Sequence, residues 1–422
     1  MDKSDESQLQ IRLITKQDIY AVPDVPLTVP ANVQAKALNE VLNQLLQENS
    51  QEFFKPKEFD FLAVGQLIRL PLIEHLQEQN VSTEVTIDVE YIERTPAPEP
   101  QETILHDDWV SSIQSNDKWI LTGCYDKSVG IWTHHGKPVI SVKEHSEIVK
   151  GVTWIDSADP SKGFISVSHD QTGIIWDWDV GTNSVTPKIS LRGHERGIDS
   201  VGVSPNCLRV ATGGWDTNLK IWSSSLDSED SGEPSSKKIR GNSSSNTVRT
   251  PVHTLKGHKE SISSVNWVDN HIVCTASMDH TIKFWDCELY GISNEIVDQK
   301  AFLSASWSPL TKTLIASSAD RHLRLYDPRS TEGTICKCMF TSHTLWVSSV
   351  MWSKYNEYLF VSGSYDSTVK MWDTRSPKAP LFNLQGHEGQ VLAVDWSNNK
   401  YLVSGGADNS VHIFKNRDVF SK

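Results

Sequence analysis

The chain has 422 residues, of which 38% are apolar, and a formal net charge of -13 at pH 7. This length allows more than one compact unit. The negative charge disfavours binding of nucleic acid or anionic membranes by the whole surface, because such binding needs many lysines and arginines. No long apolar run and no signal-peptide core occurs, and the six cysteines are scattered without a C-x-x-C pair. We therefore expect a soluble intracellular protein with reduced thiols and no contact with membranes.

The first part of the chain predicts a small α+β unit. Residues 9–15 alternate in polarity and predict a strand, and an extended stretch at 20–29 follows it, as in a hairpin. Pro30 then suits the first position of an amphipathic helix, whose apolar residues lie at Leu38, Val41, Leu42, Leu45 and Leu46. The rest of the unit is predicted as two short strands, a helical turn and a last strand, at residues 59–65, 67–70, 71–77 and 83–92.

The last predicted strand has two different faces. One face is apolar and the other forms an acidic stripe, with Val85, Ile87, Val89 and Tyr91 on the first and Glu84, Thr86, Asp88 and Glu90 on the second. Periodicity alone explains the stripe as a solvated sheet face. The order of elements predicts a ubiquitin-like β-grasp domain over residues 1–93. Residues 94–101 contain three prolines and predict an extended linker.

The remainder of the chain repeats one pattern seven times. In each copy an Asp in a predicted turn is followed six positions later by an aromatic residue, as in VSGSYDSTVKMWD. The pairs are Asp126 and Trp132, Asp170 and Trp176, Asp216 and Trp222, Asp279 and Trp285, Asp320 and Tyr326, Asp366 and Trp372, and Asp408 and Phe414. A period in the low forties with this pattern is typical of WD repeats. Residues 102–422 therefore predict a seven-bladed WD-repeat β-propeller, so that the whole chain is mainly β.

One interval between successive turn aspartates is about 20 residues longer than the others. The excess falls in the Ser-rich, charged segment 223–251, between the third and fourth repeats. Its composition predicts a disordered insertion. The seventh copy leaves no residues for an outermost strand, so we expect the segment 102–105 to supply that strand and close the ring.

The repeated polar residues are predicted to be structural. A His precedes each copy except the fifth. This His, the turn Asp, the Trp and a Ser or Thr such as Ser362 can form one hydrogen-bonded network within a blade. The histidines are His106, His145, His194, His258, His343 and His387. Because they recur in separate blades they cannot converge on one metal or catalytic site. Among exposed aromatic residues, Trp109 and Trp346 follow such a His by three positions and are candidates for an interface, with packing between blades as the alternative.

At this point the chain resembles a known family. The segments IRLITK, FDFLAVGQLIR, VSTEVTIDVEY and HDDWVSSI are similar to those of the WD-repeat ribosome-biogenesis proteins of the PeBoW complex, which carry a Notchless-like amino-terminal domain. The resemblance covers nearly the whole chain. It implies a non-enzymatic assembly factor for the large ribosomal subunit, which acts in the nucleolus and nucleoplasm in maturation of the 28S and 5.8S rRNA.

The resemblance also implies partners and a site. The partners are pescadillo, the propeller of the block-of-proliferation protein, the pre-60S particle, and the ATPase midasin, which removes the factor. In this family a Glu that opens the last strand of the amino-terminal domain binds the metal-ion-dependent adhesion site of midasin, and the matching residue is Glu84. A hard divalent cation favours such a carboxylate oxygen, and no other cofactor is expected.

Two other functions remain open on the residues alone. The chain could be a ubiquitin-pathway adaptor, with the β-grasp domain recruiting a ligase or proteasome and the propeller holding a substrate. It could also be a propeller hydrolase, which would require carboxylates that converge in the central channel. No phosphate-binding or nucleophile motif supports an enzyme.

Overall fold

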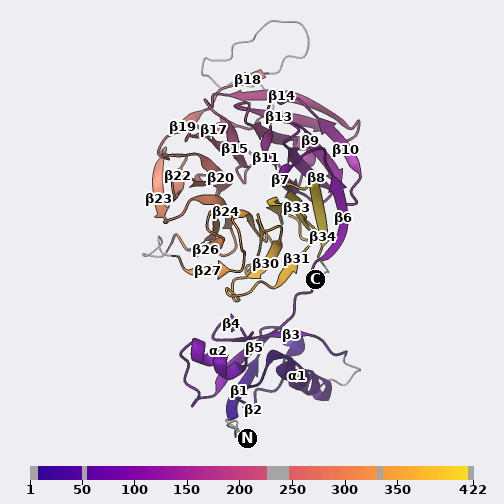
Figure 1. Cartoon of the computed structure of the whole chain (residues 1–422), viewed down its shortest axis with the longest axis vertical. Coiled ribbons are helices and arrows are strands. Elements are labelled where there is room, and N and C mark those ends of the chain that lie inside the picture. The colour runs from indigo at the N-terminus through magenta and orange to yellow at the C-terminus, as the bar shows by residue number, and fades with distance from the viewer. Residues whose placement is uncertain (1–7, 50–54, 226–246, 330–335, 417–422) are drawn as a thin grey trace. The chain divides into compact units, whose positions relative to one another are not determined.

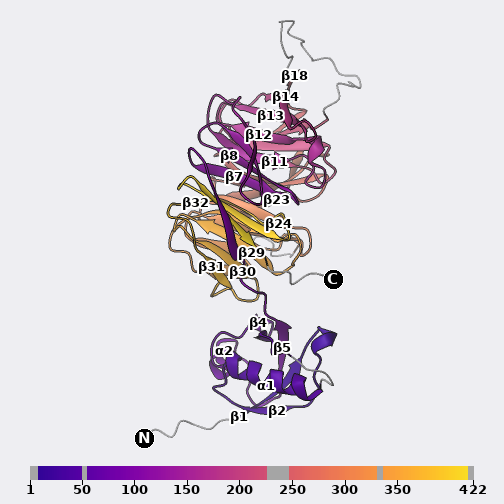
Figure 2. The same ribbon diagram turned by 90° about the vertical axis from the view of Figure 1, so that its right-hand side faces the viewer.

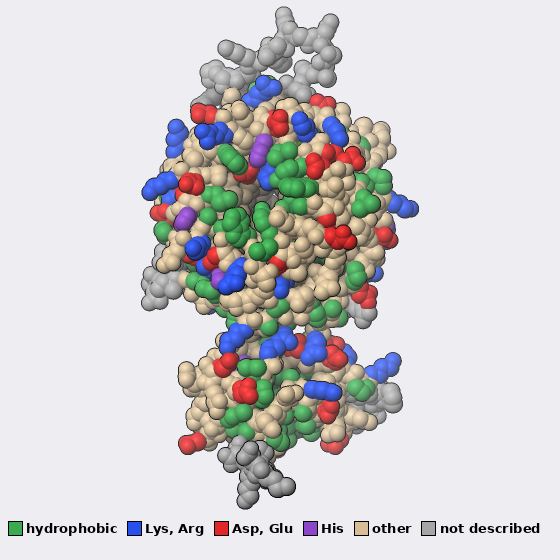
Figure 3. Space-filling view, viewed as in Figure 1, with side chains coloured by type: hydrophobic (Ala, Val, Ile, Leu, Met, Phe, Trp, Pro, Cys, Tyr) green, Lys and Arg blue, Asp and Glu red, His purple; other side chains and the backbone are tan. Residues whose placement is uncertain are grey.

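A computed structural model describes residues 8–49, 55–225, 247–329 and 336–416. It divides the chain into two compact units with the boundary between Pro96 and Ala97. Helices make up a small part of it, and no helix in these described ranges combines the length and apolarity needed to cross a bilayer. On the face visible in Figure 3, Lys and Arg side chains are interspersed with Asp and Glu.

The amino-terminal unit is a five-stranded mixed sheet with two helices. Its strands run in the order β2-β1-β5-β3-β4, and β1 and β5 are parallel neighbours at the centre. Its elements are β1 (Gln8–Ile14), β2 (Leu27–Pro30), α1 (Ala35–Asn49), β3 (Phe59–Ala63), β4 (Gln66–Leu67), α2 (Leu72–Glu78) and β5 (Ile87–Glu93), with a 3-10 turn at Asp18–Tyr20. This is the predicted ubiquitin-like arrangement (Figure 1).

Periodicity explains the core of this unit. Leu38, Leu42 and Leu46 recur on one side of α1 and are buried in the same cluster as Ile11 of β1 and Val89 of β5. The helix nevertheless begins five residues later than predicted, because Pro30 ends β2 by pairing with Gln8. Figure 2 shows both helices beside the sheet.

The predicted last strand is also shorter than expected. β5 begins at Ile87, so Val85, which was expected to face the core, is 61% exposed. The predicted linker 94–101 ends three residues earlier than expected, at residue 98, because residues from Glu99 onward belong to the next strand, β6 (Glu99–Leu105). Backbone pairing, which periodicity does not report, sets both boundaries.

The described residues of the second unit form seven blades around a central axis (Figure 1). Blade 1 contains β7 (Val110–Ser115), β8 (Trp119–Cys124), β9 (Val129–Thr133) and β10 (Pro138–Val142). Blade 2 contains β11 (Val149–Trp154), β12 (Phe164–Ser168), β13 (Thr172–Asp179), β14 (Ser184–Arg192) and β18 (Thr247–Arg249), with a 3-10 turn at Pro160–Lys162. Blade 3 contains β15 (Ile198–Val203), β16 (Arg209–Gly214), β17 (Leu219–Ser223) and β19 (His253–Leu255).

The remaining four blades complete the disc. Blade 4 contains β20 (Ile262–Trp267), β21 (Ile272–Ser277), β22 (Thr281–Asp286) and β23 (Gly291–Val297). Blade 5 contains β24 (Phe302–Ser308), β25 (Thr313–Ser318), β26 (His322–Tyr326) and β27 (Cys338–Thr341). Blade 6 contains β28 (Val347–Trp352), β29 (Leu359–Ser364), β30 (Val369–Asp373) and β31 (Phe382–Leu384). Blade 7 contains β32 (Val391–Asp395), β33 (Tyr401–Gly406) and β34 (Ser410–Lys415), followed in the sheet by β6.

The ring closes between the two ends of the second unit. β6 pairs antiparallel with β34, with Leu105 opposite Ser410 and Glu99 opposite Lys415. The prediction that a segment before His106 supplies the outermost strand is confirmed, and the strand is longer than the four residues expected. The first strands of adjacent blades contact one another around the axis, including β32 with β7. Adjacent blades share apolar clusters, as expected for sheets that cannot bury both faces alone.

Both described ends of the predicted insertion 223–251 contain residues of propeller strands. Ser223 belongs to β17, and β18 adds a fifth strand to blade 2 by pairing parallel with β14. The central part of the predicted segment, 226–246, lies outside the described residues. The polar composition at the end of the segment hid β18, which is stabilised by pairing with the edge of blade 2.

Candidate interaction sites

Blade 6 shows the hydrogen-bonded network that the sequence predicts. Nδ1 of His343 lies 2.9 Å from a carboxylate oxygen of Asp366, and its Nε2 lies 2.8 Å from Oγ of Ser362. The indole N–H of Trp372 donates to the same Oγ at 2.8 Å. The ring of His343 is buried, which lowers its pKa even though Asp366 opposes that shift. A neutral ring with its proton on Nδ1 donates to Asp366 and accepts from Ser362, so every member of the network is satisfied.

The same network recurs in blades 2, 3 and 4. The His and Trp contacts to the hydroxyl, and the His contacts to Asp, all measure 2.7 or 2.8 Å. The residues are His145, Ser166, Asp170 and Trp176; His194, Thr212, Asp216 and Trp222; and His258, Thr275, Asp279 and Trp285. These side chains are therefore committed to the framework of each blade.

The turn Asp has a second role, which explains why Asp occupies this position. The residue after it has a positive φ, between 61° and 71°, in all seven repeats. One carboxylate oxygen of the Asp accepts the backbone N–H two positions later, as Asp366 does from Thr368 at 3.1 Å. The other oxygen accepts the N–H that follows the His, as from Thr344 at 3.0 Å. The Asp thus fixes a tight turn and joins it to the preceding loop.

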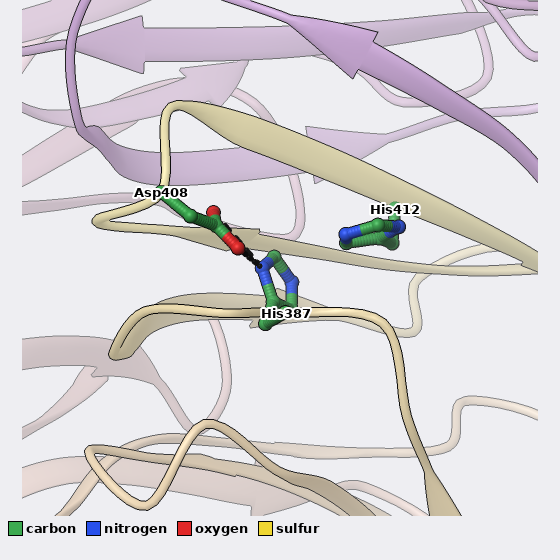
Figure 4. A group of neighbouring side chains, drawn as sticks. All are labelled: His387, Asp408 and His412. Carbon is green, nitrogen blue, oxygen red and sulfur yellow. Dashed lines mark hydrogen bonds and ion pairs between the residues drawn. The ribbon is translucent and has the colours of Figure 1, made fainter.

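Blade 7 lacks the indole donor and contains a second His. Phe414 stands at the Trp position, and His387 contacts both Asp408, at 2.9 Å, and Ser404, at 2.8 Å. Figure 4 shows His412 beside this pair, and these three side chains could in principle hold a metal ion. Each ring nitrogen, however, already has a hydrogen-bond partner: His412 contacts Thr103 and Ser410 at 3.0 and 3.2 Å. The cluster is explained as part of the seam where β6 joins β34.

Blade 1 has an incomplete network. His106 and Trp132 both contact Oγ1 of Thr122 at 3.0 Å. Asp126 instead forms an ion pair with Lys143 at 2.7 Å, and Nδ1 of His106 is buried without a partner in the described structure. Asp126 and His106 are therefore not joined as the pattern predicts.

Blade 5 replaces the network with an ionic one that the sequence analysis missed. Ala316 stands at the hydroxyl position, opposite Arg324, and Tyr326 stands at the Trp position. Arg324 forms ion pairs with Asp320 and, at 3.0 Å, with Asp298. The hydroxyl of Tyr326 donates to Asp298 at 2.7 Å. Asp298 lies four residues before β24, the same offset that separates His258 from β20, and this register was the signal that could have revealed it.

Glu84 lies in the amino-terminal unit, three residues before β5 begins. Glu84 was expected to open the last strand, but it lies in a bend before that strand. There its backbone N–H donates to Oγ of Ser82 at 3.3 Å. Its side chain is exposed, and its carboxylate has no ion pair or hydrogen bond within the described residues.

The other acids of this segment are already paired. Arg12 donates two hydrogen bonds to Asp88, at 2.8 and 2.9 Å, which lower the pKa of that carboxyl group. Lys16 lies 3.3 Å from Glu90. Lys57 and Tyr20 both contact Glu93, each at 2.8 Å. The predicted acidic stripe is thus largely neutralised, and Glu84 is its free carboxylate.

Trp109 and Trp346 occupy matching positions in blades 1 and 6. They are 43% and 50% exposed. Each packs on the Tyr that precedes the turn Asp of its own blade, Trp109 on Tyr125 and Trp346 on Tyr365, with ring centroids 5.3 and 6.1 Å apart. About half of each indole therefore remains available to a partner, and its role in an interface stays a prediction.

Comparison with known proteins agrees with this architecture. Residues 9–76 match the NLE (NUC135) domain, and six segments match the WD domain, G-beta repeat, at 99–133, 185–223, 249–286, 298–327, 334–373 and 378–415. The chain is 51% identical over 413 residues to the ribosome biogenesis protein WDR12 homolog of Aedes aegypti, covering 98% of this chain and 96% of that protein. The homolog of Drosophila erecta is 47% identical over 417 residues, covering 99% and 97%.

The chain belongs to the WDR12 family. In this WDR12-family chain the six matched segments omit residues 134–184, which contain β11, β12 and β13 of blade 2. The network of His145, Ser166, Asp170 and Trp176 is nevertheless complete there. Glu84 lies beyond the matched NLE segment, in the connection to β5.

The networks predict how stability depends on pH in this WDR12-family chain. Burial raises the pKa of Asp170, Asp216 and Asp408, but hydrogen bonds from the His partners and turn residues outweigh it and leave each at about 2. Because these values lie below the ordinary 3.8, the unfolded chain binds those protons more readily, and the stability from these groups is lost as pH falls below about 4. Burial lowers the pKa of His343 and His387 below 6.5, so stability also falls as pH drops through 6.5.

We therefore expect the melting temperature to fall in two stages, between pH 7.5 and 5 and again below about 4. Thermal unfolding followed by circular dichroism over this range checks the expectation. A melting temperature that rises between pH 7.5 and 5 would contradict the burial of neutral histidines in these blades.

Proposed function

We propose that this protein is a non-enzymatic assembly factor for the large ribosomal subunit, and that Glu84 is the handle by which midasin removes it. The relatives named above are ribosome biogenesis proteins, which supports the assembly role. The observation that supports this role of Glu84 is that its carboxylate has no partner among the described residues, whereas Asp88, Glu90 and Glu93 of the following strand are paired. A carboxylate with no internal counter-ion can complete the coordination of a divalent cation held by another protein.

The propeller provides the platform for the other partners. The repeated His, Asp and Trp side chains form hydrogen bonds within the blades. Exposed loop residues such as Trp109 and Trp346 are therefore the ones that can contact a partner. In the proposed function the propeller binds the propeller of the block-of-proliferation protein and, with pescadillo, joins the pre-60S particle in the nucleolus and nucleoplasm. Maturation of the 28S and 5.8S rRNA depends on that assembly.

Substitution of Glu84 tests the handle. Glu84→Ala and Glu84→Gln should reduce Mg²⁺-dependent binding of the full chain to midasin to the level measured in EDTA, because neither side chain supplies an anionic ligand. Glu84→Asp should bind weakly, since its carboxylate is one methylene short. Glu74→Gln, at an exposed acid on α2, is the matched control and should bind normally. Binding by Glu84→Ala at the level of the unchanged protein would rule out the assignment.

Co-purification separates the assembly role from the handle. The Glu84→Ala variant should still recover pescadillo, the block-of-proliferation protein and pre-60S particles, because the propeller is unchanged. Recovery of ubiquitin-ligase subunits in place of these particles would favour the adaptor function and would contradict the assembly role whatever the result with midasin.

A further inference from the structure

A pocket of about 370 Å³ opens between blades 2 and 3 and has no part in the proposed function. It is lined by His169, Gln171, Arg196, Gly197 and Trp215. These residues come from the two turns that contain Asp170 and Asp216 and from the loop between β14 and β15. Loops of these two kinds also carry Tyr125 and Trp109 in blade 1, so the pocket lies on the same face of the disc as the exposed aromatics.

Contacts within the protein fix the walls of this pocket. Nε2 of His169 lies 2.7 Å from Asp199, and its ring packs edge-on against Trp215 with centroids 5.7 Å apart. The backbone N–H of Trp215 donates to the carbonyl of Gly197 at 2.9 Å. A Cβ on Gly197 would come within 2.9 Å of the His169 ring, so glycine is needed for this close approach. The pocket is therefore formed before any ligand binds.

Two groups in the pocket are free to recognise a ligand. The side chain of Arg196 is exposed and makes no ion pair or hydrogen bond with any described residue. Trp215 is 52% exposed, with one side of its indole packed by His169. A guanidinium group binds a carboxylate through two parallel hydrogen bonds, and an indole offers a flat surface to an apolar side chain. Arg and Trp are also the residue types that most often dominate binding energy at interfaces.

We propose that this pocket binds an acidic side chain, Asp or Glu, next to an apolar residue in an extended segment of a partner protein. The carboxylate pairs with Arg196 and the apolar neighbour packs on Trp215. The surroundings favour a peptide over RNA. Glu195 precedes Arg196 in the same loop and Asp199 lies against His169, whereas a phosphate backbone needs several lysines or arginines in a row.

Selection from a phage-displayed library of random seven-residue peptides, panned on the full chain, tests this proposal. The selected peptides should contain Asp or Glu beside Leu, Ile, Met or an aromatic residue. Labelled with fluorescein and measured by anisotropy, they should bind Arg196→Ala and Trp215→Ala at least about 10-fold more weakly, as expected for residues that dominate an interface.

Matched variants on the same face of the propeller test whether the loss of peptide binding is specific to this pocket. Leu345→Ala removes an apolar side chain that is 52% exposed, as Trp215 is, in the corresponding loop of blade 6, and Lys259→Ala removes an exposed cation in the corresponding loop of blade 4; both should keep the affinity of the unchanged chain. Circular dichroism verifies that all four variants are folded. The proposal is overturned if panning enriches no sequence, if the selected peptides lack acidic residues, or if their affinity survives Arg196→Ala or Trp215→Ala. Loss of binding in Leu345→Ala would also overturn it. So would binding of a single-stranded RNA of 12 nucleotides at this pocket in place of the peptides.

Discussion

Trp372→Ala should lower the free energy of unfolding of the propeller by about 3–5 kcal/mol, the range measured for large buried aromatic side chains. Trp372 is fully buried and packs against Phe340 and Phe360. Its removal leaves a cavity between strands and also takes away the indole N–H that Ser362 accepts. Chemical unfolding followed by circular dichroism measures the change.

Two further substitutions separate packing from hydrogen bonding. Trp372→Phe keeps most of the ring volume and should lower the free energy of unfolding less than Trp372→Ala does. About 1 kcal/mol of its effect should come from the lost hydrogen bond. Trp346→Ala, on the surface of the same blade, should change stability by no more than about 0.5–1 kcal/mol. Equal losses from Trp372→Ala and Trp346→Ala would mean that the repeated Trp does not hold the blade together.

Arg324→Ala should destabilise the propeller by about 3–5 kcal/mol, the range for breaking a buried ion pair from one side. Arg324 is 8% exposed and lies between Asp298 and Asp320, whose carboxylates lose their shared counter-charge in the variant. The hydrogen bond from Tyr326 remains but cannot neutralise Asp298. The loss should be largest at neutral pH and decrease in acid. Burial raises the pKa of Asp320, but hydrogen bonds from Arg324 outweigh it and lower this pKa below its usual range, so the stability they contribute is lost once the carboxylate is protonated.

Arg329→Ala in the same blade is the control. Arg329 pairs with Asp327 at 2.9 Å, but its side chain is 56% exposed, so its removal should cost less than about 1 kcal/mol. A loss for Arg324→Ala as small as that for Arg329→Ala would show that the ionic network of blade 5 contributes little to stability.

The regular parts of this fold were predictable because they recur. The seven Asp–aromatic pairs have one spacing in the chain and one position in the blades, and the short seventh repeat indicated that an upstream strand must close the ring. The helical period of Leu38, Leu42 and Leu46 was similarly clear, because burial against a sheet selects residues on one side of a helix.

Departures from the pattern were harder to predict. In blade 5 the network was rebuilt with different chemistry, and only the strand register shows that Asp298 stands where a His is expected. β18 is polar and short, so nothing local distinguishes it from the segment beside it; pairing with β14 decides its structure. Whether an exposed acid such as Glu84 is paired depends on Arg12, Lys16 and Lys57, which are distant in sequence from it.

The strand that closes the propeller also sets the path of mechanical load. Within the described part of the chain, residues 94–98 connect β5 of the amino-terminal unit to β6, so tension passing along this connection reaches the propeller first at the pairing of Glu99 with Lys415. That is one end of the seam between β6 and β34, which contains the contact of Thr103 with His412. A pull on the amino-terminal unit would therefore act on the joint that keeps the ring closed before it acts on any other blade.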